Sequence, residues 1–271
     1  MLRKLFIVFI LSLSLCFAVK VVSPVNTKVS NGDMIDLGII GPGQTVSILI
    51  DPLVSTGGIH DIGGVYDLAE AKDLPSGWKS EESKLYQNPL QVTVTADPNA
   101  VVGVYYSNII VMDERDGEEL GNVTFVVKVT ITWDVMDVEV SPAKTTVGPG
   151  QPARFSITIY NKASTSDVFE VSAVGPRKWE FKRPVFVAAK SSRTIDYELV
   201  GGEEEEYTAT IKVVSLASEN IASEKNVSLS IRSDVLGDYK ATNNGVIVFP
   251  IFETIVYSLA GLLSNLFSLF N

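Results

Sequence analysis

Between residues 19 and 233 the chain is dominated by alternating apolar and polar positions. In the range 154–159, Phe155, Ile157 and Ile159 are separated by single polar residues, and the range 90–95 follows the same pattern. Successive side chains of a β-strand point to opposite faces, so a period of two predicts strands with one buried face. Many short segments of this kind, separated by glycine-rich turns, predict an all-β fold.

One β-unit is written twice along the chain. Gly41-Pro42-Gly43-Gln44 precedes the strand-like range 45–51, and Gly148-Pro149-Gly150-Gln151 precedes the strand-like range 154–161. The landmark separations are 107 residues from Gly41 to Gly148, 101 from Trp78 to Trp179, 102 from Tyr105 to Tyr207 and 104 from Asn122 to Asn226. A nearly constant separation indicates an internal repeat. We therefore expect two tandem immunoglobulin-like β-sandwiches.

The first sandwich is expected at residues 19–132 and the second at residues 133–240. The link between them, residues 131–135, contains no glycine or proline. Two sandwiches joined so closely favour a stiff rod over flexibly linked beads.

The larger separation of the first landmark pair places extra residues in the first copy, in a loop at residues 54–75. Paired glycines bracket His60 and Asp61 there. Long loops are where sandwiches carry specificity, so His60 and Asp61 are a candidate binding loop. The alternative is a solvent-exposed histidine without a role. Residues 67–72 are expected to form one or two helical turns.

Recurring aromatic residues are interpreted as architectural. Tyr105 and Tyr207 stand near the start of the penultimate strand of each copy, where a tyrosine hydroxyl can bond back to nearby backbone. Trp78 and Trp179 are expected to pack in the core or at its edge. The alternative is a sugar-stacking surface of a carbohydrate-binding module.

Charge and composition exclude several classes of function. The 32 acidic residues outnumber the 22 basic ones, giving a net charge of −10 that would repel nucleic acid. His60 and Cys16 are the only histidine and cysteine, so multi-histidine and multi-cysteine metal sites cannot form. We expect no catalytic, cofactor-binding or metal-binding residues and no enzymatic activity. The acidic range 113–119 contains an Asp-Gly pair typical of a tight hairpin, and it lacks the ligand spacing of a calcium loop.

Residues 1–18 have the pattern of a secretory signal peptide. Arg3 and Lys4 precede an apolar stretch at residues 5–15, and the small residues Cys16 and Ala18 place cleavage after Ala18. A short membrane anchor and a lipoprotein signal at Cys16 are the alternatives. The mature chain is expected to be exported to the outer face of the cell membrane.

The C-terminal residues 246–270 are strongly apolar and contain a single charge, Glu253. A helix from residue 251 to residue 270 would be about 30 Å long, enough to cross a bilayer. No Lys or Arg follows it. One face carries small polar residues of the type that mediate helix–helix contacts in membranes: Ser258, Gly261, Ser264, Asn265 and Ser268. We expect a membrane anchor that could also mediate oligomerisation; the alternatives are an interfacial or partner-bound helix and a core helix.

Asn122 and Asn226 each begin a glycosylation sequon, Asn-Val-Thr and Asn-Val-Ser. Export makes glycosylation of both possible, and both are expected at equivalent places where a strand begins.

Residues 137–233 resemble the immunoglobulin-like modules of the NEW3 and CARDB type found in exported archaeal and bacterial proteins. The resemblance rests on the ranges 147–151, 155–161, 176–179 and 207–211, and it reaches the first copy more weakly through the ranges 41–51, 75–78 and 103–105. It implies non-catalytic spacer, adhesion or carbohydrate-associated modules. The expected function is a membrane-anchored surface protein whose sandwiches act as a stalk or an interaction surface for other surface proteins or glycans. The alternatives are an accessory subunit of an envelope complex and a carbohydrate-binding module.

Overall fold

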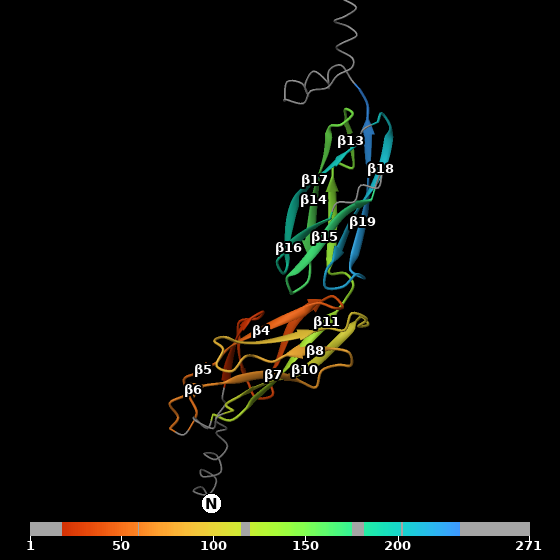
Figure 1. The fold of residues 1–271 in the computed structure, drawn as a ribbon. Helices are drawn as coiled ribbons and strands as arrows, with labels where there is room; N and C mark the ends of the chain where they lie inside the picture. The colour runs from red at the N-terminus through yellow and green to blue at the C-terminus, as the bar shows by residue number, and fades with distance from the viewer. Residues whose placement is uncertain (1–17, 59, 115–119, 175–181, 202, 234–271) are drawn as a thin grey trace, which may run out of the picture.

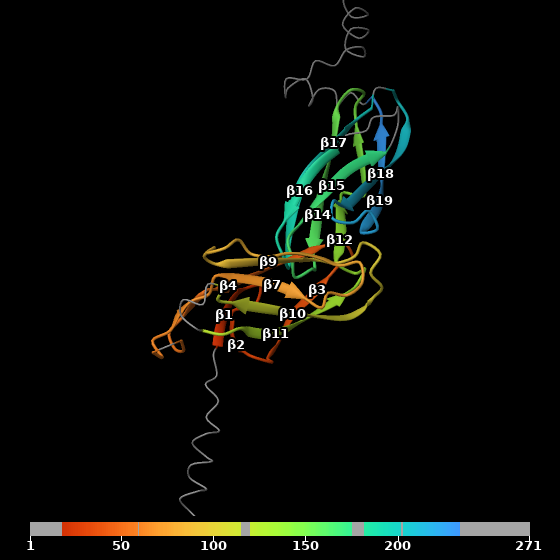
Figure 2. The ribbon, with the colours of Figure 1, turned by 60° about the horizontal axis from the view of Figure 1, so that its bottom comes forward.

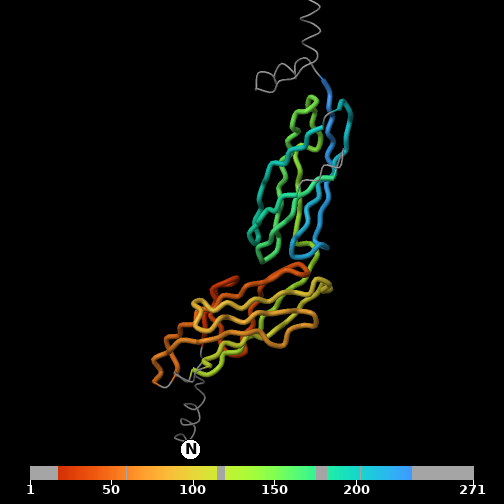
Figure 3. Tube along the Cα trace, viewed as in Figure 1, coloured from red at the N-terminus to blue at the C-terminus, as the bar shows by residue number. Residues whose placement is uncertain are grey.

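The computed structural model describes residues 18–58, 60–114, 120–174, 182–201 and 203–233, and in these ranges the regular elements are all β-strands. The predicted all-β fold is confirmed. The strands form two sandwiches that lie end to end, set at an angle to one another (Figure 1). The chain passes between them once, through residues 132–135 (Figure 3). Residues 1–17 of the predicted signal peptide and residues 234–271, with the predicted C-terminal helix, lie outside the described residues, whereas Ala18 begins strand β1.

The first sandwich packs a five-stranded sheet against a four-stranded sheet (Figure 2). In spatial order the larger sheet contains β2 (Thr27–Ser30), β1 (Ala18–Ser23), β4 (Thr45–Asp51), β9 (Leu90–Thr95) and β8 (Lys79–Glu81). The smaller sheet contains β3 (Met34–Ile40), β11 (Val123–Ile131), β10 (Gly103–Met112) and β7 (Leu68–Lys72). Alternate residues such as Ile48, Val92 and Phe125 form one fully buried core, as the period-two pattern predicted.

The second sandwich has its own core between two further sheets. The three-stranded sheet contains β12 (Met136–Ser141), β14 (Pro152–Asn161) and β17 (Ser191–Val200). The five-stranded sheet contains β13 (Lys144–Val147), β19 (Ala222–Ile231), β18 (Glu206–Ser215), β15 (Asp167–Val174) and β16 (Lys182–Val187). Phe155, Ile157 and Ile159 of β14 are completely buried.

The two sandwiches share most of their topology. The first strand of each copy, β1 or β12, pairs antiparallel with β4 or β14, and a later strand, β3 or β13, pairs parallel with the last strand, β11 or β19. In the first copy the larger sheet has the order β1-β4-β9-β8 and the smaller sheet the order β3-β11-β10-β7. These are the strand orders of an immunoglobulin-like sandwich. The copies differ in the placement of one strand. In the first copy β8 pairs with β9, whereas in the second copy β16 pairs with β15 and therefore lies in the other sheet.

The sequence-based interpretation of residues 67–72 as helical turns is wrong. Residues 68–72 form strand β7, which pairs with residues 108–112 of β10. Ala69 and Ala71 face the core while Lys72 is exposed, so burial of two small residues on one face decides the strand. The extra residues of the first copy therefore lie between Asp51 and Leu68, where a small β5–β6 hairpin (Leu53–Val54 with Gly64–Val65) forms, and not over the whole range 54–75.

The expected equivalence of the two sequons is also wrong. In the first copy Tyr105 pairs with Val129, and in the second Tyr207 pairs with Leu229, so Asn226 corresponds to Val126 and not to Asn122. The connection from β10 to β11 is four residues longer than that from β18 to β19, which shifted the apparent spacing. Asn122 directly precedes β11, whereas Asn226 lies within β19; both side chains are exposed.

Candidate functional site at the junction of the sandwiches

The Gly41-Pro42-Gly43-Gln44 turn forms the contact between the two sandwiches. All four residues are buried. The amide of Gln44 donates to the carbonyl of Gly41 at 3.2 Å, and Gly43 has a φ of +77°. Proline followed by a glycine with positive φ is the geometry of a type II turn. We call the set of contacts between this turn and the second sandwich the joint.

A buried polar connection crosses the joint. The Gln44 side-chain amide donates from Nε2 to Oδ2 of Asp167 at 2.7 Å, while its Oε1 accepts the Gly41 backbone amide at 2.8 Å. The hydroxyl of Ser215 donates to the same Asp167 oxygen at 2.7 Å. Gln44 is 1% exposed and Asp167 is 7% exposed. Buried polar groups are costly without partners, so these bonds fix one geometry of the joint.

Asn161, the last residue of the repeated strand motif, shapes the loops that face the first sandwich. Its Nδ2 donates to the carbonyls of Thr165 and Ala188 at 2.9 and 3.1 Å, and its Oδ1 accepts the Ala163 amide at 3.0 Å. The loop after β14 and the loop before β17 are thereby held together at the end of the second sandwich.

Ser164 and Thr165 bond to the first sandwich from those loops. The backbone amide of Ser164 donates to the Ile39 carbonyl at 2.7 Å, and its Oγ accepts the Ile39 amide at 3.2 Å. The Thr165 hydroxyl donates to the Thr45 carbonyl at 2.6 Å. Gly38 leaves room for this approach, because a Cβ there would collide with the Ser164 hydroxyl.

An apolar cluster completes the joint. Val135 of the link packs with Ala163 and Ile221 of the second sandwich, and none of the three is more than 3% exposed. A Cβ on Gly41 would lie 2.5 Å from Ile221 and 2.9 Å from Val135. A side chain at this position would force the methyl groups of Ile221 and Val135 to move, so glycine allows the turn to pack closely against the second sandwich.

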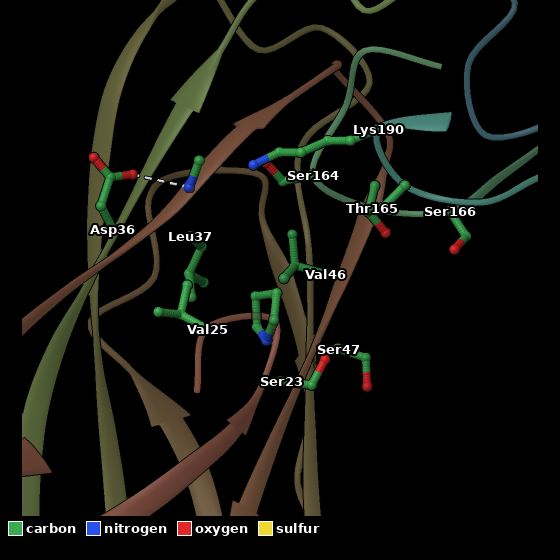
Figure 4. A pocket seen from close by; sticks show the side chains of 13 residues that line it. Ser23, Val25, Asp36, Leu37, Val46, Ser47, Ser164, Thr165, Ser166 and Lys190 are labelled. Carbon is green, nitrogen blue, oxygen red and sulfur yellow. Dashed lines mark hydrogen bonds between the residues drawn. The ribbon is translucent and has the colours of Figure 1, made fainter. Parts of the chain in front are cut away.

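Beside the joint the two sandwiches enclose a groove of about 460 Å³. Its walls carry hydroxyls from Ser47, Ser164 and Thr165, and Lys190 reaches toward Ser164 from the second sandwich (Figure 4). The Asp36 carboxylate accepts the Gly38 amide at 2.8 Å and the Lys128 ammonium at 2.7 Å. The bond from Lys128, with the Gly38 amide, lowers the pKa of Asp36. The groove is open and is lined by both polar and apolar residues, and it exists only while the joint holds the sandwiches together.

Strand β16 is an edge strand whose described basic residues face solvent. Lys182 and Arg183 are exposed, and Lys182 pairs with Glu170 at 3.2 Å. These two residues therefore lie on a solvated edge of the sheet. Arg177, Lys178 and Trp179 lie outside the described residues.

His60 and Asp61 occupy an exposed turn away from the joint. The Asp61 carboxylate accepts the Gly57 amide at 2.8 Å, and Asp61 has a φ of +56°. This carboxylate therefore shapes its own loop. No group of three or more His, Cys, Asp or Glu side chains that could hold a metal ion is found in the part of the chain that the structure describes.

The architectural interpretation of Trp78 and Tyr105 is confirmed. Trp78 is 8% exposed and its ring lies 5.3 Å from the ring of Tyr105, so its faces are covered. The Tyr105 hydroxyl donates to the Val101 carbonyl at 2.9 Å, as expected for a corner tyrosine. Tyr207 packs against the second core.

Sequence reasoning identified the turn that forms the joint but missed its partners. Gln44 and Asp167 are 123 positions apart, and nothing in either local pattern pairs them. The sequence did contain one signal, the glutamine at position 44, which directly precedes a predicted strand. A buried side-chain amide needs hydrogen-bond partners, so a glutamine buried at this place would require a polar partner. The predicted membrane helix stripe, Ser258 to Ser268, lies outside the described residues. In the ranges of the chain that the structure describes, no helix has the length and apolarity needed to span a bilayer.

No protein-family model matches the sequence, and no curated protein matches it. Solved structures that match part of the chain include the complex of zinc 2-glycoprotein with prolactin-inducible protein from human seminal plasma. The match has 9% identity and a TM-score of 0.31, and it covers 36% of this chain and 95% of that chain. The CARDB domain of a Pyrococcus furiosus protein, solved in complex with di-metal ions, has 16% identity and a TM-score of 0.27, covering 36% and 91%. A C. elegans member of the MSP family has 18% identity and a TM-score of 0.23, covering 35% and 97%. Each match corresponds to about one third of this chain.

Proposed function

We propose that this chain is an exported, membrane-anchored surface protein whose two sandwiches form a rigid stalk. The buried connection from Gln44 to Asp167 and Ser215 is the observation that carries this proposal. A stalk holds its far end at a defined place only if its modules keep a fixed relative orientation.

The chemistry of the joint supports rigidity. Four residues separate β11 from β12, so the link has few conformations to begin with. Separating the sandwiches would break the hydrogen bonds of Ser164 and Thr165 and expose the cluster of Val135, Ala163 and Ile221. Each hydrogen bond contributes about 1 kcal/mol net, and the buried apolar cluster adds to that resistance.

The finer assignment rests on the sequence patterns. We propose that the sandwiches are modules of the NEW3 and CARDB type, that residues 1–18 direct export and that residues 246–270 anchor the chain in the membrane. The groove beside the joint offers a surface for another surface protein or a glycan, since its hydroxyls and Lys190 can bond to polar groups.

Cell fractionation of the full chain tests this proposal. We expect the chain in the membrane fraction, released by detergent and not by high salt, and cleaved by a protease added to intact cells. A chain in the soluble fraction, or one protected from external protease, contradicts the proposal. Release only together with a stoichiometric partner would favour an accessory subunit of an envelope complex instead.

A further inference from the structure

The outer end of the second sandwich repeats the first half of the joint. The Gln151 amide donates to the Gly148 carbonyl at 3.1 Å, and Gly150 has a φ of +75°. The corresponding values for Gln44 and Gly43 are 3.2 Å and +77°. The turn that carries the second sandwich on the first is therefore present again where the second sandwich ends (Figure 1).

The last strand also leaves both sandwiches in the same way. The Thr132 amide donates to the Ile40 carbonyl at 3.0 Å in the first copy, and the Arg232 amide donates to the Val147 carbonyl at 3.0 Å in the second. The residues that follow match as well: Ile131-Thr132-Trp133-Asp134-Val135 in the first copy and Ile231-Arg232-Ser233-Asp234-Val235 in the second share Ile, Asp and Val. In the first copy these residues lead directly into the joint, where Val135 covers Gly41.

Among the described residues, the second turn lacks the cover that the first turn has. A Cβ on Gly43 would lie 2.5 Å from the Ala217 carbonyl oxygen, whereas one on Gly150 would meet no atom of the described residues within 4 Å. Gln44 donates from Nε2 to Asp167, whereas Nε2 of Gln151 is buried and has no hydrogen-bond partner in the described part of the chain. A buried amide without an acceptor costs free energy, so this end of the sandwich is built to receive an acceptor.

We propose that the chain segment from Asp234 to Gly245 docks on the turn at residues 148–151 and forms a second joint. Val235 would cover Gly148 as Val135 covers Gly41, and an oxygen of this segment would accept the Gln151 amide. The segment begins two residues after the last shared backbone bond, so tethering gives it a high effective concentration at the turn. Such a joint would fix the direction in which the chain continues toward residues 246–270. The inference goes beyond the proposed stalk, since a second joint can exist whether the chain is a stalk or a subunit.

Disulfide trapping in the full chain, with Cys16→Ser in every variant, tests the second joint. The test pair is Gly148→Cys with Val235→Cys. The matched positive control is Gly41→Cys with Val135→Cys, at the positions that touch in the first joint. The negative control is Asn122→Cys with Val235→Cys. We expect the test pair to oxidise at a rate within about tenfold of the positive control, measured by loss of thiols that react with a maleimide. Oxidation no faster than in the negative control overturns the proposal.

Hydrogen exchange gives a second readout that needs no cysteine. In the Val235→Asp chain we expect the Arg232 amide to exchange at least about tenfold faster than in the unaltered chain, while the Thr132 amide is unchanged. Unchanged exchange at Arg232 overturns the proposal. If the positive-control cysteines do not oxidise, the joint between the sandwiches is contradicted, and hydrogen exchange at Arg232 then decides the second joint on its own.

Discussion

Gln44 illustrates how one side chain can connect two modules. Its carbonyl oxygen accepts within its own turn and its amide nitrogen donates to Asp167 of the other sandwich. A glutamine has both groups on one planar amide, so the turn and the joint share one orientation of the side chain.

Replacement of Gln44 by leucine should destabilise the protein. The Gly41 amide would lose its acceptor and the Asp167 carboxylate one of its donors, which predicts a loss of about 2–3 kcal/mol in the free energy of unfolding. Denaturant-induced unfolding measures this loss. Gln91→Leu is the matched control, because Gln91 makes a part-buried bond to Ser47 within one sandwich, and it should cost about 1 kcal/mol or less. Equal effects of the two substitutions would contradict the role of Gln44.

Tyr66 is a buried residue in the core of the first sandwich. The side chain is fully buried and its hydroxyl has no hydrogen-bond partner among the described residues. Tyr66→Phe should therefore raise the free energy of unfolding by about 1 kcal/mol at neutral pH. A loss of stability in the phenylalanine variant would show that the hydroxyl is bonded.

The same residue predicts a dependence on alkaline pH. Burial, with a smaller contribution from Asp113, raises the pKa of Tyr66 above its ordinary value. The unfolded chain then loses this proton first, so stability falls as the pH rises above about 10. The difference in the free energy of unfolding between Tyr66→Phe and the unaltered chain should widen there, as measured by unfolding at pH 7 and pH 11. A constant difference would contradict the raised pKa.

At the scale of elements, the Gly-Pro-Gly-Gln turn has one backbone geometry and two environments. Both central glycines have positive φ, which explains why the sequence repeats them. Within the described residues, only the first turn packs against another sandwich. A comparison of the two turns therefore separates the cost of the backbone conformation from the contribution of packing in the joint.

Alanine substitutions at the two glycines should therefore differ. Each places a side chain at positive φ and costs about 1 kcal/mol. Gly43→Ala also forces a Cβ against the Ala217 carbonyl oxygen, so it should cost at least about 1 kcal/mol more than Gly150→Ala. Paired unfolding measurements compare them. Equal costs would show that the first turn is not packed as the structure describes.

Strand positions could be predicted well where alternation was strong and poorly where burial decided. β14 follows from the alternation of apolar residues such as Phe155 and Ile157, and the corner bond of Tyr105 followed from its place near the start of β10. β7 was missed because alanines suit a helix as well as a strand, and its pairing with β10 is a tertiary effect. The sequons were misaligned because the β10–β11 connection is longer than the β18–β19 connection, although the separations between the landmark residues are nearly constant. The joint could not be predicted, since its bonds connect residues more than 100 positions apart.

At the scale of the whole molecule, two sandwiches of similar topology act as one body because they meet through a turn that both possess. The joint combines backbone bonds, a buried carboxylate and an apolar cluster. The groove beside it is lined by residues of both sandwiches. The affinity of any ligand of the groove would therefore depend on whether the joint is intact.

The distribution of distances between the sandwiches tests the central claim most directly. Spin labels at Lys28→Cys and Lys225→Cys, both exposed positions in different sandwiches, can be measured by pulsed electron spin resonance in a Cys16→Ser chain. A rigid joint predicts a single narrow distance distribution that broadens when Gln44→Leu is added. A broad or multiple distribution in the chain with an unaltered joint would contradict it.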